Sequence, residues 1–116
     1  MGVPLDISLG VAYTESRFNP RAHNLNTNGT VDHGIFQVND AVFKDLKTVH
    51  KPCVYRDILI GVYWLKCLYK RAGSWDDAIR AFNAGFAGMK RGGGFQYLKL
   101  VWAYAYSQPS YGGEVK

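Results

Sequence analysis

A run of polar, turn-forming residues interrupts a chain that otherwise has the periodicity of helices. Residues 23–29 read His-Asn-Leu-Asn-Thr-Asn-Gly. The closing Asn-Gly pair favours the tight turn of a β-hairpin. Short extended pieces are expected at 30–31 and 35–38, on either side of Gly34. Because a helix does not continue through such a segment, the pattern predicts a small β-hairpin inserted after the first helix.

Apolar residues at helical spacing surround this insertion. The clearest row is Ile58, Val62, Leu65 and Tyr69, and Leu98, Val101, Trp102 and Ala105 share a face further along the chain. Pro4, Asp40 and Ser74 are suited to helix starts, while Asn19-Pro20, Gly73 and Gly85 are suited to helix ends. We expect helices at 5–18, 41–47, 55–71, 75–84 and 95–107, with a glycine-rich loop at 85–94.

The length of 116 residues predicts one domain, residues 1–116, in which residues from about 108 to 116 form a loose tail. With 47% hydrophobic and 20% charged residues, the chain belongs to the class of globular proteins. The predicted fold class is α+β, predominantly helical, and we expect a monomer. No apolar run approaches the roughly 18 residues of a membrane span.

The charge balance points to an acidic polymer as partner. Fourteen Lys and Arg against nine Asp and Glu give a net charge of +5. Nucleic acid is disfavoured, because the basic residues are scattered and only 70–71 and 90–91 are adjacent pairs. Aromatic residues make up 15% of the chain, which suggests a groove lined with rings in addition to the core.

Neither a disulfide nor a metal site is expected. Cys53 precedes a predicted helix and Cys67 lies well inside it, which places them too far apart for a bridge. We therefore predict free thiols. His23, His33 and His50 together with the cysteines lack zinc-ligand spacing, so we predict no metal and no cofactor.

Glu15 is the candidate for acid–base chemistry. It follows Ser8, Val11 and Ala12 on one stripe of the first predicted helix, which faces the core or its margin. Burial disfavours the ionised carboxylate and raises its pKa, which suits a general acid. The alternative is a solvated Glu15 that pairs with a neighbouring arginine.

Four segments in order resemble the motifs of the lytic transglycosylase SLT family. Residues 15–22 read Glu-Ser-Arg-Phe-Asn-Pro-Arg-Ala and 34–37 read Gly-Ile-Phe-Gln. Residues 81–85 read Ala-Phe-Asn-Ala-Gly and 97–101 read Tyr-Leu-Lys-Leu-Val. The resemblance spans roughly residues 3–105. It implies a lysozyme-like fold and cleavage of the β-1,4 bond between N-acetylmuramic acid and N-acetylglucosamine in peptidoglycan.

The resemblance also implies roles for single residues. Glu15 would donate a proton and then accept one, giving a 1,6-anhydro product. Ser16, Phe36, Gln37, Asn83 and Tyr97 would bind substrate or support Glu15. The family usually has Tyr where this chain has Phe82, so a hydroxyl that can orient the glutamate is missing and a higher pKa is expected for Glu15.

Residues 15–39 also resemble the active-site stretch of animal-type lysozymes, which use a second carboxylate at the position of Asp32. A hydrolytic lysozyme acting through Glu15 and Asp32 is therefore the alternative function. A non-catalytic glycan-binding module is a more distant one, since it predicts a replaced Glu15.

Residues 28–34 resemble most the small family members of secretion, conjugation and phage injection systems. The sequence shows no signal peptide before its first helix. We therefore expect a part of a larger phage virion or secretion-machine protein, or export by another route, with action on the bacterial cell wall in the periplasm.

Overall fold

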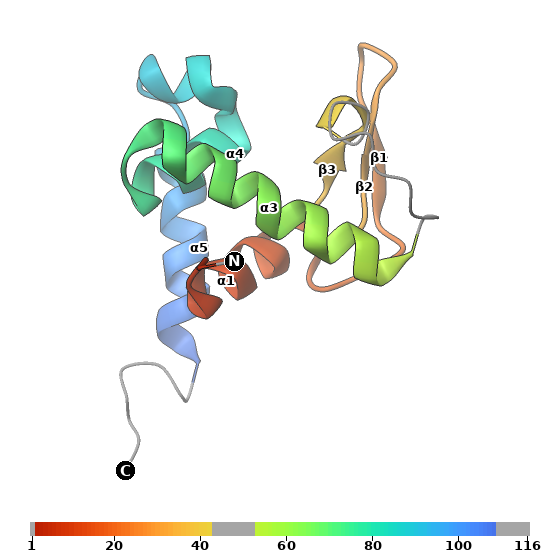
Figure 1. Ribbon diagram of the computed structural model, residues 1–116, viewed down its shortest axis with the longest axis horizontal. Helices are drawn as coiled ribbons and strands as arrows, with labels where there is room; N and C mark the ends of the chain where they lie inside the picture. Colours follow the sequence, from red (N-terminus) through yellow and green to blue (C-terminus); the bar gives the residue numbers. More distant parts are fainter. Residues whose placement is uncertain (1, 43–52, 109–116) are drawn as a thin grey trace.

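The computed structural model describes residues 2–42 and 53–108, and shows a mostly helical domain with a small antiparallel sheet (Figure 1). In chain order its elements are α1 (Leu5–Ser16), β1 (His23–Leu25), β2 (Val31–His33), β3 (Val38–Asn39), α3 (Val54–Ala72), α4 (Trp75–Lys90) and α5 (Phe95–Ser107). The predicted fold class is therefore confirmed. The predicted helix at 41–47 falls mostly, and the predicted tail almost entirely, outside the described residues.

The sheet is a three-stranded meander and not the predicted single hairpin. β1 and β2 pair around the Asn28-Gly29 turn, with Leu25 opposite Val31, as predicted. β3 then adds to β2 with His33 opposite Val38. Residues 35–37, predicted to be extended, form a turn. Left-handed backbone at Gly34 and Gln37 reverses the chain there, which brings the third strand alongside the second.

The ends of α3 and α4 follow local sequence signals. The Ser74 hydroxyl accepts a hydrogen bond from the Asp77 N–H at 3.2 Å, which is the predicted cap of α4. Cys53 caps α3 in the same manner, its sulfur accepting from the Arg56 N–H at 3.4 Å. Cys53 and Cys67 are both free thiols, as predicted.

The long helix α3 crosses the molecule from the sheet to α4 (Figure 1). Its buried residues are Ile60, Gly61, Leu65 and Leu68. Of the predicted row Ile58, Val62, Leu65 and Tyr69, only Leu65 is among them, so the buried face is rotated about the helix axis from the predicted one. Ile58 is 36% exposed. The shift has a steric reason, because a Cβ at Gly61 would lie 2.3 Å from Cγ of Phe36. This glycine therefore allows the 34–37 turn to pack directly on the helix.

α1 packs mainly against α5, and its buried residues are Ile7, Gly10, Val11 and Ala12. Val11 and Ala12 were expected on the stripe that leads to Glu15. Leu5 and Leu9 of the same helix are exposed, at 72% and 39%. Burial therefore depends on which neighbours α1 meets, since several of its faces are apolar enough to be covered.

α4 is bent at Gly85, where φ is 78° and ψ is 161°. The predicted end of the helix at this glycine is right, but the predicted glycine-rich loop at 85–94 was wrong for its first part, because the chain resumes a helix through Lys90. Arg80, only 8% exposed, holds this second piece by donating to the carbonyls of Met89 and Gly93, at 2.9 and 3.0 Å.

Candidate active site

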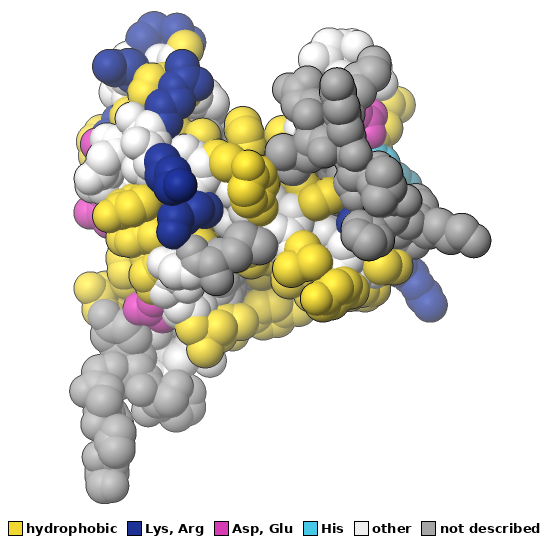
Figure 2. All heavy atoms as spheres, viewed as in Figure 1, with side chains coloured by type: hydrophobic (Ala, Val, Ile, Leu, Met, Phe, Trp, Pro, Cys, Tyr) yellow, Lys and Arg dark blue, Asp and Glu magenta, His cyan; other side chains and the backbone are white. Residues whose placement is uncertain are grey.

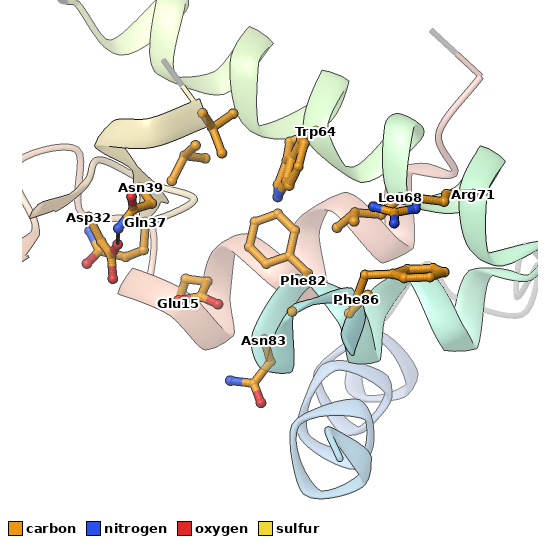
Figure 3. A pocket seen from close by; sticks show the side chains of 14 residues that line it. Glu15, Asp32, Gln37, Asn39, Trp64, Leu68, Arg71, Phe82, Asn83 and Phe86 are labelled. Atoms are coloured by element: carbon orange, nitrogen blue, oxygen red, sulfur yellow. Dashed lines mark hydrogen bonds between the residues drawn. The ribbon is translucent and has the colours of Figure 1, made fainter. Parts of the chain in front are cut away.

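A pocket of about 460 Å³ lies between the lobe formed by α4 and the lobe formed by the sheet. Figure 2 shows the molecule hollowed between these two lobes, and Figure 3 shows the side chains that line the hollow. Four residues that the sequence singled out meet here, namely Glu15, Asp32, Gln37 and Asn83. They come from α1, β2, the turn before β3, and α4.

Glu15 lies in the last turn of α1, and its carboxylate contacts α5. The Tyr97 hydroxyl donates a hydrogen bond to Glu15 Oε2 at 2.6 Å, joining residues 82 positions apart in the chain. Burial of the carboxylate, together with the charge of Asp32, raises the pKa of Glu15 to about 7, although the bond from Tyr97 acts in the opposite direction. Glu15 therefore carries a proton in a large fraction of molecules at neutral pH, the state that a general acid needs.

The Tyr97 hydroxyl acts as a hydrogen-bond donor to Glu15, because it remains protonated. Its side chain is buried, with 8% exposed. Burial, followed by the charge of Glu15, raises the pKa of Tyr97, so the phenol keeps its proton. Phe82 lacks the hydroxyl that the family usually has at its position, and the hydroxyl that contacts Glu15 is that of Tyr97 in α5.

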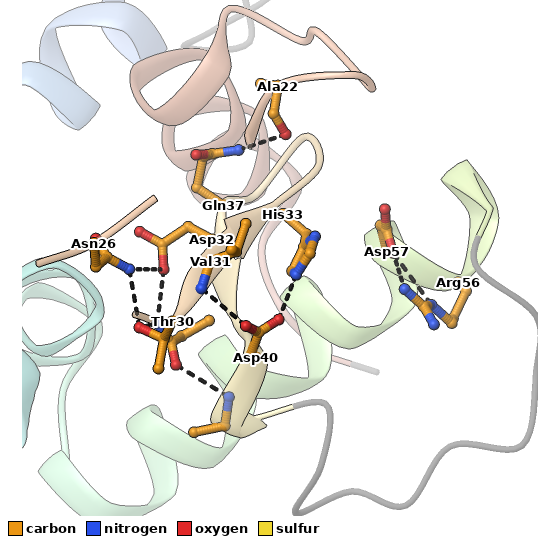
Figure 4. A network of polar contacts seen from close by, with 12 residues as sticks. Ala22, Asn26, Thr30, Val31, Asp32, His33, Gln37, Asp40, Arg56 and Asp57 are labelled. Carbon is orange, nitrogen blue, oxygen red and sulfur yellow. Dashed lines mark hydrogen bonds and ion pairs between the residues drawn. The ribbon is translucent and has the colours of Figure 1, made fainter. Parts of the chain in front are cut away.

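Asp32 is held by amide side chains at the centre of the sheet (Figure 4). Its Oδ1 accepts hydrogen bonds from Asn39 Nδ2 at 2.9 Å and from Asn26 Nδ2 at 3.2 Å. Both asparagines also donate to the Thr30 hydroxyl. Oδ2 accepts no hydrogen bond from any residue in the described ranges, which leaves this oxygen available to a ligand in the pocket.

Gln37 is fixed by the backbone around it. Its Nε2 donates to the carbonyls of Ala22 and Gly34, both at 2.9 Å. These two bonds use both amide hydrogens, so only the carbonyl oxygen of the side chain remains to accept a bond from a ligand. Gln37 also adopts φ of 52°. The two hydrogen bonds from the Gln37 amide therefore stabilise the turn, and the turn fixes the position of the amide.

Asn83 differs from Gln37 because no described residue holds its amide. It is exposed on α4, two residues before the bend. Its side chain lines the pocket with both donor and acceptor atoms available (Figure 3). A hydrogen bond from Asn83 to a ligand is therefore possible without breaking one within the protein.

Three residues of the predicted substrate-binding set do not line the pocket, namely Ser16, Phe36 and Tyr97, the last of which contacts Glu15 instead. The Ser16 hydroxyl donates to the Ile35 carbonyl at 2.7 Å, so it joins α1 to the following turn. Phe36 is 3% exposed and packs in the core against α3. Phe82, which meets Phe36 edge-on with centroids 6.5 Å apart, lines the pocket where Phe36 does not.

The far end of the pocket consists of residues that the sequence had not indicated. Trp64, Leu68 and Arg71 line it from α3, and Phe86 lines it from the second piece of α4. The spacing of the α3 residues, four and then three, is that of one helix face. A helix face with this spacing commonly packs in a core. Here it lines the pocket together with Gly85, where α4 bends.

The described part of the chain holds no group of three or more His, Cys, Asp or Glu side chains placed to bind a metal. His50 lies outside the described residues. None of the helices in the described ranges combines the length and hydropathy needed to cross a membrane.

Comparison with known proteins gives relatives across most of the chain. It is 30% identical over 111 residues to Protein IpgF of Shigella flexneri, covering 86% of this chain and 70% of that protein. It is 28% identical over 106 residues to Invasion protein IagB of Salmonella typhimurium, covering 84% and 64%. It is 30% identical over 94 residues to X polypeptide of Escherichia coli, covering 74% and 54%. No solved structure matches significantly.

The family comparison covers the site as well as the fold. Residues 1–104 match the transglycosylase SLT domain, a range that includes every residue of the pocket described above. This family is associated with transglycosylase activity, as its name states. The helical fold with its small sheet agrees with the lysozyme-like architecture expected from the resemblance. The chain belongs to the transglycosylase SLT domain family.

Proposed function

We propose that this protein is a lytic transglycosylase that cleaves the β-1,4 bond between N-acetylmuramic acid and N-acetylglucosamine in peptidoglycan. The observation that carries the proposal is Glu15, a half-buried carboxyl with a pKa of about 7 at the wall of a pocket. Family membership supports the reaction class. No cofactor takes part in the proposed reaction.

In the first step Glu15 gives its proton to the glycosidic oxygen, and the bond from that oxygen to C1 of the muramic residue breaks. Positive charge develops at C1. In the second step ionised Glu15 takes the proton of the C6 hydroxyl of the same sugar, and O6 bonds to C1. A 1,6-anhydro ring forms, no water is consumed, and Glu15 again carries its proton.

The other residues would assist by binding and orientation. Tyr97 positions the carboxyl of Glu15 through the 2.6 Å hydrogen bond. Asn83 and the side-chain oxygen of Gln37 would bond hydroxyl or acetamido groups. Phe82 offers an apolar surface for a sugar ring.

Hydrolysis by a lysozyme-type mechanism is the second candidate, and Asp32 favours it. This carboxylate lines the same pocket as Glu15, and its Oδ2 has no bond from described residues. In a hydrolase Asp32 would stabilise or attack C1, and water would complete the reaction.

Mass spectrometry of digested peptidoglycan distinguishes the two candidates. We expect anhydro products, which lack one water relative to hydrolysed ones, and loss of all products with Glu15→Gln. Asp32→Asn is the companion variant, and a transglycosylase should retain most of its activity. Hydrolysed products, together with a loss near ~10³-fold in Asp32→Asn, would instead support the lysozyme mechanism.

We further infer action on the cell wall in the periplasm, as part of a larger phage or secretion machine or after export. The substrate lies there, and one similar protein is named an invasion protein. Cell fractionation that finds the protein only in the cytoplasm would contradict this inference.

A further inference from the structure

Two cations approach one aromatic ring at the end of the pocket that lies beyond Phe82. The guanidinium carbon of Arg71 lies 4.0 Å from the centroid of the Phe86 ring, and the ammonium of Lys90 lies 5.5 Å from the same centroid. Arg71 comes from α3, and the other two residues follow the bend in α4. We call Arg71, Phe86 and Lys90 the cationic rim.

The charges of this rim are not neutralised within the described part of the chain. Neither Arg71 nor Lys90 forms an ion pair with a described residue, and both are exposed. The neighbouring Arg80 differs, because it is buried and bonded to Asp77 at 2.9 Å. Two like charges beside one ring repel each other, and an anion bound between them would relieve the repulsion.

The position of the Arg71 guanidinium over the Phe86 ring also suits recognition of a carboxylate. A guanidinium that lies on a ring keeps its N–H groups directed outward in its own plane, where they can form two parallel bonds to one carboxylate. The ring fixes the orientation of the group before a ligand arrives, so less conformational freedom is lost on binding.

The rim is continuous with the pocket that holds Glu15. Arg71 and Phe86 line that pocket, and with Lys90 they also line an adjoining one of about 430 Å³. Figure 3 shows Arg71 and Phe86 on the opposite side of Phe82 from Asp32, and Figure 2 shows Lys and Arg side chains gathered on the α4 lobe. A polymer bound at Glu15 would therefore place its substituents beside the rim.

We propose that the cationic rim binds carboxylates of the stem peptide carried by muramic acid, and thereby favours peptide-bearing glycan strands over stripped ones. The proposal rests on the proposed function. N-acetylated sugar rings are uncharged, so the negative charge of such a strand is on its peptides. A nucleic acid would need more phosphate contacts than two cations supply.

The test compares two substrates prepared from the same phosphate-free peptidoglycan strands. One keeps its stem peptides, and the other is stripped by an amidase, which leaves a single lactyl carboxylate on each muramic residue in place of the several carboxylates of the peptide. The measured quantity is the ratio of kcat/KM for peptide-bearing strands to that for stripped strands. We expect wild type to prefer the peptide-bearing strands by about fivefold, the size that two exposed charge contacts provide. The preference should fall as salt is added.

The double variant Arg71→Gln/Lys90→Gln should lose most of this preference. Its matched control is Lys70→Gln/Lys99→Gln, which removes the same charge from exposed positions that line neither pocket. The control should keep the wild-type ratio. An unchanged ratio in the rim variant, or an equal fall in the control, would overturn the proposal.

A binding measurement separates this proposal from the proposed function. Glu15→Gln protein, with and without the rim substitutions, is titrated with the same two kinds of strand. If wild type cleaves neither strand, the proposed function fails, while a rim-dependent preference in binding still supports the rim. If neither Glu15→Gln protein prefers peptide-bearing strands, or if a single-stranded oligonucleotide displaces them at equal concentration, the rim proposal is wrong.

Discussion

At the scale of single residues, the contact between Glu15 and Tyr97 combines two opposing effects on one proton. Burial raises the pKa of Glu15, whereas the hydrogen bond from Tyr97 stabilises the ionised form and lowers it. The net value of about 7 keeps both protonation states accessible near neutral pH. A residue that first gives and then takes a proton needs both states.

Tyr97→Phe tests this balance. Loss of the hydroxyl removes the bond that favours ionised Glu15, so the pKa of Glu15 should rise and the alkaline limb of kcat/KM should move to higher pH. The maximum rate should fall, because the carboxyl is no longer oriented. The measurement is a pH profile of wall-lysing activity.

Tyr104→Phe is the matched control for that variant. It removes the same atom from the same helix, at a ring that stacks on Tyr13 with centroids 4.3 Å apart. Its pH profile should match wild type. An alkaline limb that stays in place in Tyr97→Phe, or moves to lower pH, would contradict the balance described above.

At the scale of elements, the bend in α4 determines how long the pocket is. Before Gly85 the helix supplies Phe82 and Asn83, and after it the chain supplies Phe86 and Lys90. The backbone values at Gly85 belong to a region that residues with a Cβ rarely adopt. Glycine at this position therefore allows one helix to line both the part of the pocket near Glu15 and the cationic rim.

Gly85→Ala should destabilise the protein by about 1–3 kcal/mol. An added Cβ would meet no atom within 4 Å, so the cost comes from the backbone alone. Gly73→Ala is the comparison, because its Cβ would also meet nothing within 4 Å and its left-handed backbone is less restrictive. Chemical denaturation measures both, and an equal or smaller loss at Gly85 would contradict this explanation.

At the scale of the whole molecule, burying the carboxyl of Glu15 lowers the stability of the folded protein at high pH. Glu15 has an ordinary value near 4.5 and a folded-state pKa of about 7, so the folded protein holds this proton more strongly than the unfolded chain. Between these two pH values the contribution of Glu15 to folding becomes less favourable as pH rises. Above pH 7 the ionised group is buried at a cost.

Glu15→Gln should therefore abolish activity and make the protein more stable than wild type at pH 8, by up to about 3 kcal/mol. Near pH 4.5 the two proteins should differ much less, because Glu15 is protonated in the folded state. Chemical denaturation at both pH values measures the difference. A stability gap of the same size at both pH values would mean that burial of the charge is not its cause.

Sequence patterns alone predicted the elements that depend on short-range interactions. The cap at Ser74, the turn at Asn28-Gly29 and the break at Gly85 were all correctly placed, because each depends on hydrogen bonds or backbone angles within a few residues. Four motifs in order, beginning with the one around Glu15, also indicated the family, which the comparison over residues 1–104 shows.

Tertiary structure alone decided which side chains meet. Tyr97 reaches Glu15 from 82 residues away, and Phe36 is buried in the core instead of facing the pocket. The guanidinium of Arg71, on α3, lies over the ring of Phe86, on α4. The physical reason is that burial depends on how helices and turns pack against one another. Apolar periodicity says that a face will be covered, but not by which element or at what angle.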